Sequence, residues 1–92
     1  MIITINKSVV FQNIEDEKVV LNLETSKYHS LNQYGLVIWD LIDKNQPIVF
    51  ENLIDLIKID YEIENNLKND IKDYIDDLHS HGLVAIEDEE KI

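Results

Sequence analysis

The sequence predicts a single α+β domain, with an antiparallel N-terminal sheet followed by three α-helices. Two patterns support this. Residues 19–24 show a period of two, as in a half-buried strand, and after residue 32 apolar residues recur every three or four positions, as in a helix. The chain has 92 residues, which suits one domain, and its 45% hydrophobic content supports a core. Because the strands and helices form separate runs, we expect the helices to pack on one face of the sheet.

The strands occupy the first third of the chain. A β-branched segment at residues 2–5 precedes a second apolar segment at 8–11, and a polar turn is expected at 13–17. Val19, Leu21 and Leu23 alternate with Val20, Asn22 and Glu24, so that one face of this strand is mostly polar, and residues 27–31 form another short strand after a turn. This spacing predicts an antiparallel meander, which forms a three-stranded sheet in the N-terminal part of the chain.

The first helix is expected to begin after Asn32, a favourable N-cap residue, and to end before Pro47. Its apolar stripe has helical spacing and comprises Tyr34, Val37, Ile38, Leu41 and Ile42. Trp39 lies beside that stripe and is interpreted as a core anchor.

Two more helices follow. The second runs from Phe50 to about Lys58, and residues 60–64 form a connection. The stripe of the third helix comprises Leu67, Ile71, Tyr74, Ile75 and Leu78. Gly82 suits the left-handed position that closes a helix, and residues 83–86 could add a short strand. This order is typical of a winged helix-turn-helix arrangement, with a single domain at 1–86 and an acidic tail at 87–92.

The charge excludes one class of partner. All eight basic residues are scattered lysines, and the formal net charge is −11. Nucleic-acid binding requires clustered cations, so no nucleic-acid partner is expected, and charge would instead steer a basic partner. The chain has no cysteine for a disulfide or thiolate site, and no apolar run of about 20 residues that could cross a bilayer. We therefore expect a cytoplasmic protein without membrane contact.

Catalytic motifs are not evident. With two glycines, the chain lacks a phosphate-binding loop, and no cofactor is expected. His79 and His81 would point about 200° apart on a helix, so no metal site is predicted from them or from His29. Asp70, Asp73 and Asp77 share one flank of the third helix, which is most simply a solvated face. The sequence thus predicts a protein that is not an enzyme.

One combination of motifs resembles a known family. An aromatic-rich strand at residues 27–31 is followed by Asn32, the small residue Gly35 and Ile38-Trp39. The later part carries Asp70-Ile71, Tyr74, Leu78 and Gly82-Leu83-Val84. From about residue 9 to residue 84, the chain is similar to the family typified by PqqD, the small chaperone of pyrroloquinoline quinone biosynthesis.

The resemblance implies a winged-helix-like fold and a role in peptide binding. Members called precursor-peptide recognition elements bind the leader of a ribosomally made peptide, which adds as a strand beside the third strand and against the third helix. The implied partners are a precursor peptide and a tailoring enzyme: a leader peptidase, a cyclase or a radical-SAM enzyme. A lasso-peptide pathway is favoured by analogy, because stand-alone domains are common there. A monomer or weak dimer is expected.

By correspondence, the expected leader-binding residues lie on the last N-terminal strand and the third helix. They are Lys27, Tyr28, His29, Ser30, Leu31, Asp70, Ile71, Asp73, Tyr74, Asp77 and Leu78. Physical chemistry supports this placement, because an edge strand without proline offers unpaired N–H and C=O groups. Apolar residues would form pocket walls, and the aspartates would pair with basic leader residues.

Two other functions remain open at this point. A winged-helix transcriptional regulator would share the architecture, but its recognition helix here would carry four aspartates against Lys68 and Lys72. A small enzyme or enzyme subunit is the third hypothesis, and no group of residues supports it.

Overall fold

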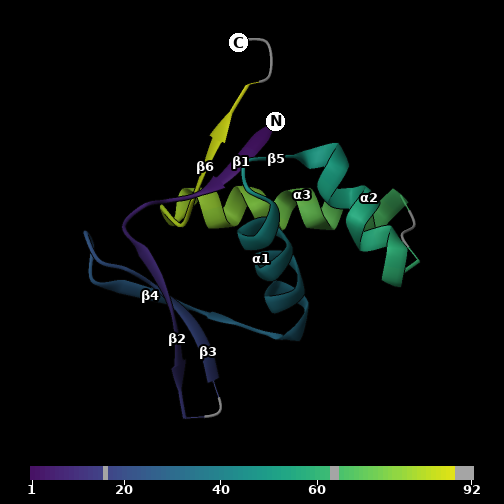
Figure 1. Ribbon diagram of the computed structural model, residues 1–92. Coiled ribbons are helices and arrows are strands. Elements are labelled where there is room, and N and C mark those ends of the chain that lie inside the picture. Colours follow the sequence, from purple (N-terminus) through teal and green to yellow (C-terminus); the bar gives the residue numbers. More distant parts are fainter. Residues whose placement is uncertain (16, 63–64, 89–92) are drawn as a thin grey trace.

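A computed structural model describes residues 1–15, 17–62 and 65–88 of the protein. It contains two small antiparallel sheets and three helices, so the α+β prediction is confirmed (Figure 1). Asp16 in the expected turn, residues 63–64 in the expected connection and residues 89–92 of the expected tail lie outside the described residues. None of the described helices is long and apolar enough to span a membrane.

The predicted meander forms the first sheet, in the order β2-β3-β4. Its strands are β2 (Val9–Ile14), β3 (Glu17–Asn22) and β4 (Lys27–Leu31). The central strand β3 pairs over its length with β2, from Val9↔Asn22 to Ile14↔Glu17, and with β4, from Lys18↔Leu31 to Asn22↔Lys27. This register buries Val20 completely and leaves β4 at one edge of the sheet.

A second sheet was only partly expected. The first strand β1 (Ile2–Ile5) lies outside the meander and pairs with β5 (Ile48–Val49) on one side and β6 (Val84–Glu87) on the other. The short C-terminal strand was predicted, whereas β5 was not, because two residues cannot show a period. Glu87 of the expected tail is the last residue of β6 and pairs with Ile2.

The first helix, α1 (Gln33–Asn45), begins where the sequence predicted. The Asn32 side-chain oxygen accepts a 2.7 Å hydrogen bond from the Gly35 N–H, which satisfies one of the free donors of the first turn. The buried face of α1 contains Gly35, Ile38, Trp39 and Ile42. Trp39 is therefore a core residue, as expected, while Tyr34 lies at the edge of the core and is 39% exposed.

The other helices are α2 (Phe50–Asp60) and α3 (Asn65–Ser80). Helix α3 ends in a Schellman motif: the Leu83 N–H donates to the Leu78 carbonyl, and the Gly82 N–H donates to the His79 carbonyl. Gly82 adopts the expected left-handed conformation, with φ of +72°. The motif turns the chain from α3 into β6, and both Leu78 and Leu83 are buried. One core then joins the sheets and helices, and it includes Ile3, Val20, Ile38, Leu53, Ile54, Ile71, Ile75 and Leu78.

Candidate functional site

The edge strand β4 is the first component of the site. Among the described residues, β4 pairs with β3 alone, so its other edge is open. Alternate residues of an edge strand direct their N–H and C=O groups away from the sheet, where another segment can bind them. The strand contains no proline, and Lys27, Tyr28 and Ser30 are exposed. The predicted open edge is therefore present.

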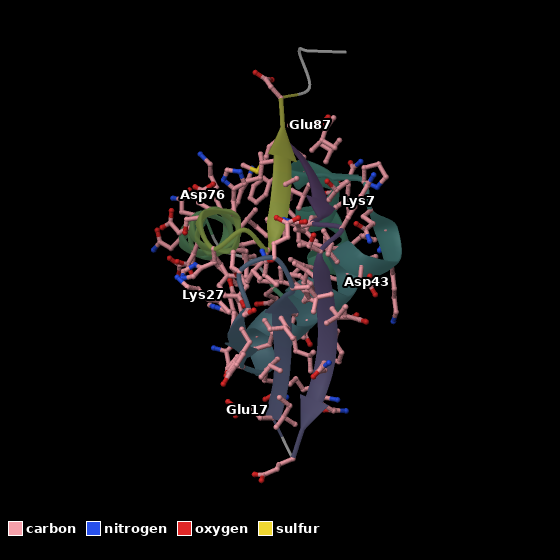
Figure 2. All side chains as sticks on the ribbon, turned by 90° about the vertical axis from the view of Figure 1, so that its left-hand side faces the viewer. Lys7, Glu17, Lys27, Asp43, Asp76 and Glu87 are labelled. Atoms are coloured by element: carbon pink, nitrogen blue, oxygen red, sulfur yellow. The ribbon has the colours of Figure 1, made fainter. Side chains whose placement is uncertain are left out.

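A hollow of about 320 Å³ lies beside this strand and against the end of α3. It is lined by Thr25, Lys27, Tyr28 and His29 on one side and by Ser80, His81, Gly82 and Leu83 on the other. Figure 2 looks along α3, which carries Asp76, and shows Lys27 next to the end of that helix. We call this hollow and the adjoining edge of β4 the β4–α3 groove.

One pair of aromatic rings joins the walls of the groove, and another joins α1 to α3. The His29 ring of β4 lies 5.3 Å from the His81 ring just after α3. The Tyr34 ring at the start of α1 lies 5.9 Å from the Tyr74 ring of α3, edge to face. The surface of α3 that faces β4 and α1 thus follows the helical spacing of Tyr74, Asp77 and His81.

Tyr74 of this pair is half-buried, whereas Tyr34 is more exposed. Burial raises the pKa of the Tyr74 phenol above its usual value, and the Asp77 carboxylate raises it further. Burial likewise raises the pKa of Tyr34, with a smaller contribution from the Asp70 carboxylate. Both hydroxyls therefore remain protonated at neutral pH and can donate hydrogen bonds to a ligand.

Most of the expected site residues lie at least partly at the surface, and three of them are buried in the core. Lys27, Tyr28 and His29 line the groove, and Asp77 lies close to His29 and His81. Ser30, Asp70 and Asp73 are also exposed, on the same strand and helix. Tyr74 is half-buried between these exposed positions and the core.

Three of the expected apolar walls are core residues instead. Leu31, Ile71 and Leu78 are 6%, 1% and 0% exposed, so they offer almost no surface to a ligand. The reason is that Ile71 and Leu78 lie at the centre of the apolar stripe of α3, and the centre of a stripe faces the core. In this structure these side chains lie in the core rather than on the groove surface: Leu31 packs β4 against the core, and Ile71 and Leu78 pack α3 against it.

A second hollow was not anticipated. It has a volume of about 510 Å³ and is bordered by α1, the end of α2 and the start of α3. Its lining is largely apolar and comprises Gln33, Tyr34, Val37, Ile38, Ile57, Tyr61, Glu62, Leu67 and Ile71. Tyr34 belongs both to this hollow and to the ring pair with Tyr74 of α3.

Asn22 is a positioning residue that the sequence did not reveal. It is 3% exposed, and its side-chain amide donates a 3.1 Å hydrogen bond to the Gly82 carbonyl. Its side-chain oxygen accepts from the Glu24 N–H at 2.9 Å, within the turn before β4. Asn22 thus fastens the start of β4 to the end of α3. Asn6 donates to the same carbonyl at 2.9 Å.

We expect Asn22→Asp to lower the free energy of unfolding by about 1–3 kcal/mol. The carboxylate can still accept the hydrogen bond from the Glu24 N–H, but it replaces the amide donor with an oxygen that faces the oxygen of the Gly82 carbonyl. Urea denaturation measures the loss. The matched control is Asn13→Asp on exposed β2, which should change stability by less than about 0.5 kcal/mol. Equal stability of the two variants would contradict a fastening role for Asn22.

The family follows from a comparison that spans both walls of the groove. The family model described as "Coenzyme PQQ synthesis protein D (PqqD)" matches residues 17–84, from β3 to the start of β6. The chain belongs to this family. The resemblance deduced from the sequence is therefore confirmed. No curated protein matches the chain.

Two solved structures of PqqD-like fold are similar to the chain. One is "TbiB1 in Complex with the TbiA(beta) Leader Peptide", with a TM-score of 0.77 and 28% identity, covering 94% of this chain and 99% of that one. The other is "Lasso peptide synthetase B1 complexed with the leader peptide", with a TM-score of 0.69 and 17% identity, covering 91% and 98%. At that identity, the second structure shows a shared fold alone. Together they confirm the PqqD-like fold class.

Proposed function

We propose that this protein binds the leader segment of a ribosomally synthesised precursor peptide, which adds as a strand to the open edge of β4 and lies against α3. The open edge of β4 beside a hollow is the observation that carries the proposal. The structure of a relative with 28% identity, titled as a leader-peptide complex, supports the choice of ligand.

Main-chain pairing provides affinity without sequence selectivity. Each backbone hydrogen bond formed with β4 would contribute about 0.5–1.5 kcal/mol net. Selectivity requires side chains, and those that line the groove include Tyr28, which is 69% exposed, and His29. In this proposal the half-buried Tyr74 of α3 adds to them. An aromatic or aliphatic anchor of the leader would pack against these rings.

The acidic flank of α3 supplies the second source of selectivity. Asp70, Asp73 and Asp77 are exposed, and the net charge of the chain is −11. These carboxylates would attract Lys or Arg residues of the leader and increase the association rate more than the affinity. The same charges argue against DNA binding through this helix, because a phosphate backbone would be repelled.

Leader binding in this proposal serves delivery to a tailoring enzyme, and the protein itself has no catalytic role. The candidate enzymes are a leader peptidase, a cyclase or a radical-SAM enzyme, and a lasso-peptide pathway is favoured by analogy with the stand-alone members of the family. The proposed setting is cytoplasmic, with the protein acting as a monomer or weak dimer without a cofactor or membrane partner.

Backbone N-methylation of the leader provides a direct test. A set of synthetic leader peptides, each methylated at one amide, would be titrated into the ¹⁵N-labelled protein. We expect affinity to fall by about tenfold at every second position and to be nearly unchanged at the positions between, since a paired strand directs alternate N–H groups towards its partner. The unmethylated leader should shift the amide signals of β4 and of residues 70–78.

The control region is β2, the opposite edge of the same sheet. If the leader shifted the amide signals of β2 and left those of β4 unchanged, binding at the β4 edge would be contradicted. Tight binding without a period-two effect of methylation would retain leader recognition but eliminate strand addition.

A further inference from the structure

Three metal-ligating side chains meet at the mouth of the β4–α3 groove. They are His29 from β4, Asp77 from the last turn of α3 and His81 from the turn that follows. One ligand atom from each residue lies within 4.8 Å of the other two. Residues 29 and 81 are far apart in sequence, so only the folded chain brings them together.

The geometry and chemistry of this group fit a transition-metal ion. Two imidazoles and one carboxylate form a ligand set that zinc accepts, with bonds of about 2.0–2.2 Å. Ligand atoms around a tetrahedral ion at that distance are about 3.4 Å apart, so small side-chain rotations would bring the three groups into range. Rotation is feasible because Asp77 and His81 are 50% and 53% exposed and His29 is partly exposed.

Asp77 fixes the orientation of the His81 ring, because the ring Nδ1 faces the Asp77 main-chain carbonyl and lies 3.6 Å from the Asp77 carboxylate. This Nδ1 lies 2.8 Å from the Asp77 main-chain carbonyl, which can only accept a hydrogen bond, so Nδ1 carries the proton. The lone pair is then on Nε2. Metal-bound histidines commonly donate their other ring N–H to a carbonyl in this way, which fixes the ring and its tautomer.

We propose that His29, Asp77 and His81 bind a divalent transition-metal ion of the zinc class, with a fourth position open towards the groove. Such an ion would connect β4 directly to the end of α3. The strongly acidic chain would favour its approach. The inference concerns the metal alone and does not depend on leader binding.

Calorimetric titration of the untagged protein with zinc chloride at pH 7.5 tests the site. We expect one ion per chain, and a loss of affinity of more than about tenfold in His29→Gln and in His81→Gln. The matched control is His79→Gln, two residues from His81 and exposed on α3, which should bind zinc as the unmodified protein does. The His29 and His81 imidazole NMR signals should move together during the titration.

Both glutamine substitutions replace partly exposed rings, and a thermal melt without metal verifies that the variants are folded. Zinc binding that persists in folded His29→Gln and His81→Gln would overturn the proposal, since it would assign the ion to other carboxylates. An equal loss in His79→Gln, or no binding to the unmodified protein, would also overturn it.

Discussion

Replacing Leu78 by alanine is expected to lower the free energy of unfolding by about 2–5 kcal/mol and to leave the leader affinity of the folded protein unchanged. Leu78 is 0% exposed, so truncation removes buried apolar surface and leaves a cavity. Its carbonyl also accepts the Leu83 N–H of the Schellman motif, but the main chain remains in the variant. Urea denaturation measures the stability, and a leader titration below the transition measures the affinity.

Asp76→Ala is the control for this substitution, because Asp76 is exposed two residues away on the same helix. Its stability should change by less than about 0.5 kcal/mol. A Leu78→Ala variant that retained its stability but lost leader affinity would indicate that the Leu78 side chain contacts the leader, and would contradict its assignment to the core.

Gly35→Ala is expected to destabilise the protein by about 1–3 kcal/mol, although alanine normally favours a helix over glycine. A Cβ at Gly35 would collide with the Tyr74 hydroxyl and lie 2.9 Å from its Cζ. The close contact between α1 and α3 therefore requires the absence of a side chain at this position. Thermal or urea unfolding of the single variant measures the cost.

A double-mutant cycle with Tyr74→Ala identifies the collision as the cause. In the Tyr74→Ala background, Gly35→Ala should become neutral or stabilising by up to about 1 kcal/mol, because the obstacle is gone and the helix propensity remains. The coupling energy between the two positions is then about 1–4 kcal/mol. Additive effects in the cycle would indicate that Gly35 is needed for another reason, such as the Asn32 cap.

Local signals in the sequence predicted most of the fold. The Asn32 cap, the left-handed Gly82 and the change from a period of two to a helical period each depend on neighbouring residues, and each is confirmed. Local signals could not identify the strands with which β1 pairs. The β-branched residues at 2–5 indicate a strand but do not distinguish pairing with the next strand from pairing with a strand about 80 residues later. The two-residue β5 is too short to carry any pattern.

The candidate site was predicted less completely, for two physical reasons. Helical spacing identifies which residues share a face but not how deeply each lies, so Ile71 and Leu78 were placed at a surface that their burial excludes. Contacts between segments that are far apart in the sequence produce no pattern among neighbouring residues. The approach of His29 to His81 and the bond from Asn22 to Gly82 both depend on how β4 and α3 pack in the folded chain.

The pairing of β1 with β6 has a consequence for how the domain can be joined to other polypeptides. Ile2 lies opposite Glu87, and Figure 1 shows the outer ends of these strands side by side, at the opposite end of the molecule from the β2–β3 hairpin. A guest protein fused before residue 2 or after residue 88 would therefore emerge away from the β2–β3 hairpin. A short tether could equally link both ends to one host chain, which makes the domain a suitable insert for a larger enzyme.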